Sequence, residues 1–482
     1  MLENLEPKNV FHFFEEITQI PRGSYNMTKI CNYMTAFARE RHLTYIQDDM
    51  CNVIIYKDGS EGYEDSPPVI LQGHMDMVAV KDPDCWKDLT VDGLDLLVED
   101  DLIRAQGTSL GGDDGIALAY GLALLDDDSI PHPPLEVVFT ADEEVGMTGA
   151  EFLDVSVLKG RTLLNIDSED EGVFTVSCAG GATVVLQLPG ATEEEDDAVA
   201  VEFYFDHFKG GHSGTKIAKG RANPNILLGR ILPKLVDFSK ELRLISVNGG
   251  TQDNAIPTFA GAVVAVPKEE ADQVTQIIED EFASIKEEYH KTDPKAKLKV
   301  SVYAAERRPV YTREATERVA ELLNKVPNGV QRMNPNVEGM VETSLNLGIL
   351  MTDEDGIRLT FCVRSASEEE KDALVNELCD IAETLGGIAQ VQSSYPGWDY
   401  RKDSRVREIM VRIYEEQYGK EPVIEGIHAG LECGMFATKI PDLDAISFGP
   451  QMYHVHTTEE ELSISSTQRT WELLLATLKA LK

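Results

Sequence analysis

Acidic side chains directly follow an apolar run in the segment Leu135–Gly146, LEVVFTADEEVG. The β-forming residues of this run end abruptly in Asp142, Glu143 and Glu144. Three successive acids cannot continue a buried strand, because burying an unpaired carboxylate is costly. The segment therefore predicts a strand that delivers carboxylates to a site at its carboxyl end. One carboxylate of such a pair can bind a metal ion while its neighbour faces the bound water, but spacing alone does not order Glu143 and Glu144.

Histidine and aspartate side chains stand at similar points elsewhere in the chain. His74 and Asp76 form a His-x-Asp motif after an apolar run, where the histidine can ligate a metal while the aspartate holds its other ring nitrogen. Asp113 lies in a glycine-rich segment that leads into a helix, and a carboxylate there can bridge two cations. Asp167 ends another apolar run, and His456 lies in the loop before the last helix.

Each of these side chains has an ordinary structural explanation when it is considered alone. A turn histidine, a helix N-cap aspartate and a polar strand end would account for them one by one. Their occurrence together, in order and at consistent positions relative to the expected elements, is a stronger signal. Aspartate, glutamate and histidine together suit Zn²⁺, with Mn²⁺ or Co²⁺ as substitutes. The pattern therefore predicts a metal site at strand ends.

The elements that must position this site are short apolar runs that alternate with segments of helical spacing. This alternation predicts an α/β domain with a mostly parallel central sheet, in which working residues collect at the carboxyl ends of the strands. A final helix that ends near Lys482 carries an apolar stripe and should dock on this domain. The expected helices include residues 9–20, 26–41 and 403–418, and the expected strands include residues 53–56, 69–71, 135–140, 162–166 and 445–448.

The order of elements changes after the segment Cys178-Ala-Gly-Gly. Residues 199–304 show the order strand, helix, strand, strand, helix, strand, which is typical of a ferredoxin-like fold. A second, less complete round follows between residues 312 and 393. We therefore predict a catalytic domain, residues 1–185 and 394–482, that is interrupted by an inserted α+β lid domain, residues 186–393, with two ferredoxin-like halves.

The length, charge and cysteine content of the chain exclude several kinds of protein and partner. A chain of 482 residues is too long for a single core, and a net charge of −40 argues against nucleic acid and anionic membrane surfaces as partners. The N-terminal segment lacks the pattern of a signal peptide, and no apolar stretch is long enough to span a bilayer. Seven cysteines at irregular spacings are typical of reduced thiols, so we expect a cytoplasmic protein.

The order of these motifs resembles that of the co-catalytic zinc metallopeptidases, which include aminoacylase and carboxypeptidase-type enzymes. Within that family the sequence is particularly similar to the cytosolic Xaa-His dipeptidases, the aminoacyl-histidine or carnosinase-like enzymes. The motifs that carry this closer resemblance span nearly the whole chain. They are Asp167-Ser-Glu-Asp-Glu-Gly, Cys178-Ala-Gly-Gly, Gly210-Gly-His-Ser-Gly214, Asn248-Gly-Gly-Thr, Asn254-Ala-Ile-Pro257, Val341-Glu-Thr-Ser-Leu-Asn346, Tyr395-Pro-Gly-Trp and His428-Ala-Gly-Leu-Glu-Cys-Gly434.

The resemblance implies a zinc-exopeptidase-like catalytic domain and two Zn²⁺ ions per chain. Asp113 would bridge the two ions. The remaining ligands would be His74 and Asp167 at one ion, and Glu144 and His456 at the other.

The resemblance also implies catalytic roles. Glu143 would be the general base, Asp76 would orient a ligand, and His212 from the lid would stabilise the oxyanion together with a zinc ion. The last ligand of the family is a histidine with acids three and four residues later, which fits His456 better than His454. The residues just before it depart from the usual Gly-Pro-His, so both histidines stay open.

Three further residues are candidates for contact with a substrate. Arg364, at a strand end, could grip a terminal carboxylate with its guanidinium group or form a surface salt bridge instead. Asn254 could also touch the substrate. Glu432 could face the free amine of a dipeptide or stabilise the fold.

We therefore expect a di-zinc metallopeptidase that hydrolyses dipeptides, with Xaa-His dipeptides such as β-alanyl-histidine as examples and Glu143 as the general base. A tripeptidase or an N-acyl-amino-acid deacylase of the same group is the nearer alternative. A non-catalytic peptide- or cation-binding protein is the alternative of another class. Small peptides are the expected partners. A homodimer is also expected, because the lid histidine of smaller relatives reaches a partner's site, although this long lid could supply both halves within one chain.

Overall fold

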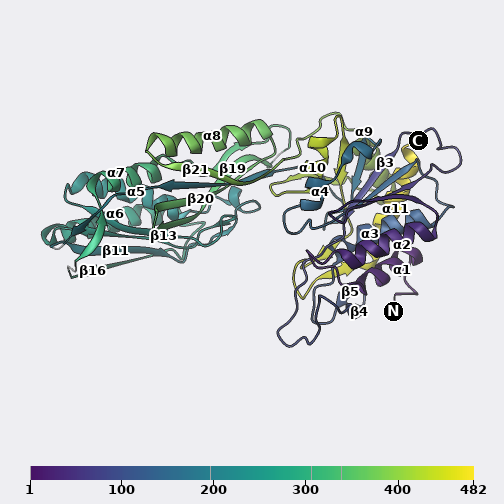
Figure 1. Cartoon of the computed structure of the whole chain (residues 1–482), viewed down its shortest axis with the longest axis horizontal. Coiled ribbons are helices and arrows are strands. Elements are labelled where there is room, and N and C mark those ends of the chain that lie inside the picture. Colours follow the sequence, from purple (N-terminus) through teal and green to yellow (C-terminus); the bar gives the residue numbers. More distant parts are fainter. Residues whose placement is uncertain (1, 196, 305–306, 338) are drawn as a thin grey trace. The chain divides into compact units, whose positions relative to one another are not determined.

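The computed structural model describes residues 2–195, 197–304, 307–337 and 339–482 (Figure 1). The chain forms two compact units. The first unit comprises Met1–Cys178, Trp398–Gly426 and Leu431–Lys482, and the second comprises Ala179–Gly397 and Ile427–Gly430. In sequence, the second unit is therefore inserted between two parts of the first. No helix among the described residues is long and apolar enough to cross a membrane.

The first unit is built on an eight-stranded sheet with a parallel centre. Its strands, in spatial order, are β1 (Thr44–Gln47), β2 (Val53–Lys57), β6 (Leu135–Thr140), β3 (Val69–His74), β7 (Thr162–Asn165), β23 (Asp444–Ser447), β8 (Val173–Cys178) and β22 (Val423–Ile427). The four strands β6, β3, β7 and β23 run parallel, whereas β1, β2 and β8 pair antiparallel. Every residue of β3 and β6 is buried, which explains why neither alternates between apolar and polar residues. The predicted parallel sheet is confirmed at its centre.

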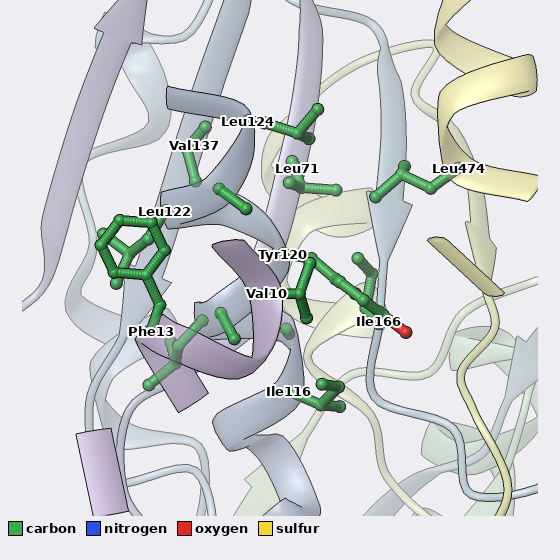
Figure 2. Close-up of a cluster of buried hydrophobic side chains, with 14 of the residues drawn as sticks. Val10, Phe13, Leu71, Ile116, Tyr120, Leu122, Leu124, Val137, Ile166 and Leu474 are labelled. Atoms are coloured by element: carbon green, nitrogen blue, oxygen red, sulfur yellow. The ribbon is translucent and has the colours of Figure 1, made fainter. Parts of the chain in front are cut away.

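The core of the first unit lies where helices pack on this sheet (Figure 2). Every residue of α3 from Gly112 to Leu125 is buried, as expected for a helix that is apolar all round. The predicted docking of the last helix is confirmed by Trp471, whose ring stacks on Tyr120 at a centroid distance of 5.5 Å. The helices of this unit are α1 (Lys8–Thr18), α2 (Thr28–Glu40), α3 (Gly112–Asp126), α4 (Thr148–Phe152), α9 (Arg405–Tyr418), α10 (Glu432–Lys439) and α11 (Ile464–Ala480).

A smaller four-stranded sheet in the first unit holds the loop that carries His456. Its spatial order is β24 (Met452–Tyr453), β25 (Glu461–Ser463), β5 (Leu102–Ala105) and β4 (Leu96–Glu99). The loop between β24 and β25 is thus closed at its base by antiparallel pairing, and the hairpin of β4 and β5 extends the same sheet.

The second unit contains one continuous antiparallel sheet formed by two ferredoxin-like halves, as predicted. The sheet is formed by β16 (Lys297–Tyr303), β11 (Val199–Asp206), β15 (Ala260–Val266), β13 (Arg243–Gly249), β19 (Val341–Asp353), β20 (Gly356–Ser365), β9 (Gly180–Leu188) and β21 (Ile388–Tyr395), in this spatial order. The helices are α5 (Pro224–Phe238), α6 (Ala271–Glu288), α7 (Arg313–Lys325) and α8 (Glu368–Thr384). Short strands complete the unit: β10 (Thr192–Glu195), β12 (Gly211–His212), β14 (Ala255–Ile256), β17 (Arg308–Tyr311) and β18 (Gly329–Met333).

The first strand of the second half is β9, and this strand corrects a predicted boundary. β9 pairs with β20 and β21 of the second half along its whole length. A domain boundary between residues 185 and 186 would cut this strand, so the inserted unit begins at Ala179 instead. The sequence pattern missed the strand, because the whole first half separates it from its partners in the chain. This also explains why the second round looked incomplete.

Candidate metal centre

Five side chains from separate elements of the first unit meet at the carboxyl ends of its parallel strands. Two of them stand on the sheet itself, since His74 ends β3 and Asp167 follows β7. Glu144 follows β6, Asp113 begins α3, and His456 lies in the loop between β24 and β25. The rule that places working residues at the carboxyl ends of parallel strands therefore describes this site.

Asp113 lies between the two histidines and presents a different oxygen to each. Its Oδ1 is 3.1 Å from Nε2 of His74, and its Oδ2 is 3.1 Å from Nε2 of His456. Each histidine has a second carboxylate beside it. Nε2 of His456 is 3.0 Å from Oε1 of Glu144, and Nε2 of His74 is 3.8 Å from Oδ1 of Asp167. The five residues thus form two clusters that share Asp113.

The donor set of each cluster fits a divalent cation. Zinc binds nitrogen and oxygen at about 2.0–2.2 Å in tetrahedral geometry, so neighbouring ligand atoms should lie roughly 3.3 Å apart, close to the spacings above. Ligand atoms of His74, Asp113 and Glu144, which come from both clusters, all lie within 4.8 Å of one another, as do those of His74, Asp114 and Asp167. In addition, the buried Oδ2 atom of Asp167 has no hydrogen-bond partner among the described residues, and a cation would satisfy it.

Asp76 fixes both the ring of His74 and the turn after β6. The Nδ1 atom of His74 is 3.1 Å from the backbone oxygen of Asp76, so the proton on Nδ1 leaves Nε2 free to ligate. The Asp76 carboxylate accepts the backbone N–H groups of Glu143 (2.9 Å) and Glu144 (3.2 Å) and the hydroxyl of Ser24 (2.8 Å). One buried carboxylate therefore positions a ligand and the acidic pair together.

The electrostatics of the cluster favour positive charge. Burial alone would raise the pKa of Asp113, but hydrogen bonds to His456 and His74 hold it well below its usual range. Hydrogen bonds to Asp113 and Glu144 raise the pKa of His456 to about 10. Burial, reinforced by the charge of Asp113, raises the pKa of Asp167 well above its usual range. In the metal-free protein, bound protons offset the negative charge of the clustered carboxylates. Divalent cations would offset that charge instead.

The members of the two pairs that the sequence left open differ in their contacts. Glu144, rather than Glu143, contacts His456. Burial raises the pKa of Glu143 to about 8, with contributions from Glu432 and Glu144. Both late histidines are exposed, but His456 places its Nε2 3.1 Å from Oδ2 of Asp113.

Sequence reasoning assigned no role to three residues of this site. Asp114, next to Asp113, is fully buried and its Oδ2 accepts the backbone N–H of His74 at 3.2 Å. Arg22 and Glu460 are buried against the loop that carries Asp113. Burial of charged side chains is the structural signal that identifies them, and the sequence had marked Glu460 only as the acid four residues after His456.

Glu432 lies beneath the site with no exposed surface. Its Oε2 accepts hydrogen bonds from the Nε2 of Gln72 and from the hydroxyl of Thr140, the latter at 2.6 Å. Gln72 in turn accepts a bond from Asn165 at 2.6 Å. The other oxygen, Oε1, is buried with no hydrogen-bond partner among the described residues, so stabilisation of the fold and contact with a substrate amine both stay predictions.

The Glu432→Gln variant should flatten part of the pH dependence of stability in the metal-free protein. Burial raises the pKa of Glu432 from 4.5 to about 7, so the folded state holds a proton that the unfolded state releases between these values. The free energy of unfolding should therefore fall by roughly 3 kcal/mol as the pH rises from 4.5 to 7, at about 1.36 kcal/mol per pH unit. Glutamine keeps one oxygen for Gln72 and Thr140 and cannot titrate.

Urea unfolding at pH 5 and pH 8 measures this difference for the wild type and the variant. Glu421→Gln, at an exposed position before β22, is the matched control and should keep the wild-type difference. An unchanged pH dependence in Glu432→Gln would show that Glu432 is already ionised in the folded state.

The second unit, considered by itself, brings His212 next to a buried arginine. The Nδ1 atom of His212 accepts the backbone N–H groups of Gly214 and Thr215, each at 3.2 Å, so its proton stands on Nε2. Burial, reinforced by the charge of Arg364, lowers the pKa of His212 and keeps the ring neutral. Asn254 is exposed beside it, and its backbone oxygen accepts the N–H of Ser213 at 2.8 Å.

Arg364 is buried and therefore does not form a surface salt bridge. Only some of its hydrogen-bond donors have partners. Its Nη1 donates to the hydroxyl of Tyr395 at 3.2 Å, while its Nε has no hydrogen-bond partner among the described residues. His428, which the sequence did not single out, is buried in the same unit with Nε2 2.7 Å from the hydroxyl of Ser344. A buried cation with an unused donor can bind an anion.

Comparison with known proteins relates this chain to peptidases. Residues 70–480 match peptidase family M20/M25/M40. The chain is 34% identical to cytosol non-specific dipeptidase of Escherichia coli (strain K12), over 99% of this chain and 98% of that protein. Its structure resembles that of aminoacylhistidine dipeptidase from Vibrio alginolyticus, with a TM-score of 0.95, 35% identity and coverage of 100% of this chain and 98% of the other.

A more distant structure shows the same fold. Aminopeptidase PepT from Bacillus cereus ATCC 10987 has a TM-score of 0.56 and 17% identity over 99% of both chains. The relatives at 34% and 35% identity also extend over the full length, but at an identity that shows the family, and they include the segments that carry the five clustered side chains. The chain is therefore a member of peptidase family M20/M25/M40, a hydrolase that acts on peptide bonds.

Proposed function

We propose that this protein is a metallo-dipeptidase whose centre holds two divalent cations, with zinc as the expected metal. The observation that carries the proposal is the position of Asp113, whose two carboxylate oxygens each face a different histidine. A carboxylate shared in this way supports two adjacent cations rather than one. Both full-length relatives are dipeptidases by name, which supports dipeptides as the substrates.

His74 and Asp167 would hold one cation. Glu144 and His456 would hold the other cation, and Asp113 would bind both. Their nitrogen and oxygen donors suit Zn²⁺, and they would also accept Mn²⁺ or Co²⁺. When bound, such cations supply Lewis acidity that polarises the scissile carbonyl and makes a water more acidic.

Glu143 is the residue that we assign as the general base. Its backbone is fixed by the carboxylate of Asp76, while its neighbour Glu144 is directed to His456. Glu143 would accept a proton from the attacking water and pass it to the leaving amine. Asp76 would hold the ring of His74 and the turn that carries Glu143 in fixed positions relative to each other.

The second unit would contribute binding groups. We assign His212 as a donor to the oxyanion of the tetrahedral intermediate, since its Nε2 carries the proton of a neutral ring. Arg364 would bind the terminal carboxylate of the peptide, since it is buried and its Nε is unused. Asn254 would add a contact beside His212.

Arg364→Lys should raise KM for dipeptides by roughly 10–100-fold with a smaller change in kcat, because lysine cannot grip a carboxylate bidentately and a bond to a charged group contributes about 1.5–3 kcal/mol. Steady-state kinetics measure the two constants. A dipeptide amide, which lacks the carboxylate, should not distinguish the variant from the wild type. Arg358→Lys, on the same strand β20, is the matched control. An equal effect on the dipeptide and its amide would contradict the assignment.

A substrate panel tests the proposed function. Carnosine, other dipeptides, a tripeptide and an N-acetyl amino acid are assayed side by side, with and without a chelator. We expect hydrolysis of dipeptides that the chelator abolishes and that Zn²⁺, Mn²⁺ or Co²⁺ restores. Preference for the tripeptide or the N-acetyl amino acid would assign the chain to another activity of its family, and chelator-resistant hydrolysis would overturn the metal centre.

We also infer a cytoplasmic location and a homodimer. All seven cysteines are free thiols, which is consistent with a reducing compartment. The homodimer rests on the resemblance described above, and light scattering of the purified protein tests it.

A further inference from the structure

Two buried side chains of opposite charge grip the loop Leu110–Asp113, which carries the shared ligand Asp113. Glu460 is only 3% exposed and Arg22 only 1% exposed. Neither residue belongs to the five clustered side chains, and both lie in the first unit together with them. Charged side chains are rarely buried to this extent unless they are hydrogen-bonded, and both of these bond to the loop, although Nε of Arg22 has no hydrogen-bond partner among the described residues.

The carboxylate of Glu460 accepts four consecutive backbone N–H groups. Oε2 accepts those of Leu110 at 2.8 Å and Gly111 at 2.9 Å. Oε1 accepts those of Gly112 at 2.8 Å and Asp113 at 3.4 Å. Gly111 is the N-cap residue of α3 and provides no side-chain cap, and Asp113 and Asp114 just after it have non-helical backbone angles. Glu460 therefore satisfies the amides of an irregular turn that precedes the regular part of α3.

A turn at Gly111 makes this grip possible. Gly111 has φ of 65°, a left-handed conformation that aims successive N–H groups toward one point and that favours glycine. A Cβ atom at Gly111 would also lie 2.5 Å from Nη2 of Arg22, so a larger residue at this position would clash with the arginine. Glycine is required here for both reasons.

Arg22 holds the same loop through its carbonyl side. Its Nη2 donates to the backbone oxygen of Gly111. Its Nη1 donates to the backbone oxygens of Met75 at 3.0 Å and Asp76 at 2.8 Å, which follow the ligand His74. A single guanidinium thus joins the segment that carries His74 to the loop that carries Asp113.

We propose that Glu460 and Arg22 are positioning residues that set Asp113 between His74 and His456 before any cation binds. Glu460 stands four residues after His456, so its hydrogen bonds connect the His456 loop to the loop that carries Asp113. The hydrogen bonds of Arg22 connect the segment after His74 to the same loop. This inference rests on the dinuclear centre proposed above. Without the grip, the two oxygens of Asp113 would have to be ordered by the cations themselves, which would weaken cation binding.

Glu460→Gln is the sharpest test, because glutamine has nearly the same shape as glutamate. Its amide offers one oxygen to the four N–H groups and turns an NH₂ donor toward two of them. The neighbouring Glu459 is exposed, so Glu459→Gln is a matched control with the same chemical change. Metal-free protein is titrated with Co²⁺ alone, and binding is followed by calorimetry and by the visible absorption of the bound ion.

The wild type should bind two Co²⁺ ions. Glu460→Gln should bind them roughly 10–100-fold more weakly and with an altered absorption spectrum, as expected when an outer-shell partner of metal ligands is changed. Glu459→Gln should match the wild type. Co²⁺ affinity and spectrum equal to those of the wild type in Glu460→Gln would overturn the inference, even if its thermal stability fell.

Glu460→Asp provides a second measurement, since a shorter carboxylate keeps the charge and the acceptors. Its Co²⁺ affinity should lie between those of the wild type and Glu460→Gln. If the glutamine variant does not fold, the aspartate variant decides the question, and a wild-type affinity there would overturn the inference. Fewer than two Co²⁺ ions in the wild type would instead overturn the dinuclear centre.

Discussion

Replacing Glu143 with glutamine is expected to lower kcat by roughly 10²–10⁴-fold, which is what a general base contributes. The variant should still bind two cations, because Glu144 and not Glu143 contacts His456. Glutamine also keeps the backbone N–H that the carboxylate of Asp76 accepts. Steady-state kinetics and metal content, measured on the same preparation, separate the loss of a base from the loss of metal.

The pH profile adds a second readout for Glu143. Only the ionised carboxylate can accept a proton, so kcat of the wild type should fall as the pH drops below the pKa of this group. Burial raises that pKa to about 8 in the cation-free protein, and bound cations would lower it. Glu143→Gln should lack this acidic limb.

Asp142→Asn is the matched control for Glu143→Gln. Asp142 precedes Glu143, and its carboxylate accepts the backbone N–H of Tyr25 at 2.6 Å, a bond that asparagine can also accept. This variant should keep most of the activity. Full activity in Glu143→Gln, or an equal loss in Asp142→Asn, would contradict the assigned base.

Asp113→Asn should weaken the binding of both cations, by more than the roughly 10–100-fold that changes outside the ligand shell cost. Asparagine replaces one carboxylate oxygen with an NH₂ group, which repels a cation, and it removes the negative charge that both sites share. Asp167→Asn changes only one cluster, so it should leave about one tightly bound cation per chain. Metal content after dialysis, measured by mass spectrometry, distinguishes the two variants.

A result in which Asp113→Asn retained one tightly bound cation would contradict the shared position of this residue. It would instead mean that the two clusters are independent sites. Loss of both cations in Asp167→Asn would also contradict it, because that outcome would require Asp167 to act beyond its own cluster.

The sequence predicted the location of the site because simple physical rules connect residue order to geometry. Parallel strands end at one edge of a sheet, so His74, Glu144 and Asp167 could be brought together from strand ends alone. The helix start at Asp113 follows the same rule. Their placement in one cluster agrees with that reasoning, whereas their catalytic roles stay predictions.

Arg22 and Glu460 could not be found in the same way. They act on backbone groups, and a backbone N–H or carbonyl is present whatever residue occupies the position. The loop they hold therefore carries almost no sequence signal beyond its glycines. The sequence pattern also did not reveal the strand β9. Its pairing partners β20 and β21 come much later in the chain, so no neighbouring segment indicates that β9 belongs to a sheet.

The late partners of β9 have a consequence for how the second unit folds. The half formed by β11, α5, β13, β15, α6 and β16 follows β9 directly in the chain, and all its strand partners within that half are local to it. β9 has to wait for β20 and β21, which are synthesised after that half. During synthesis, the first half can therefore close while β9 remains an unpaired, apolar strand. Pairings between segments so distant in the chain form slowly, so β9 is a segment of the nascent chain that needs protection from aggregation.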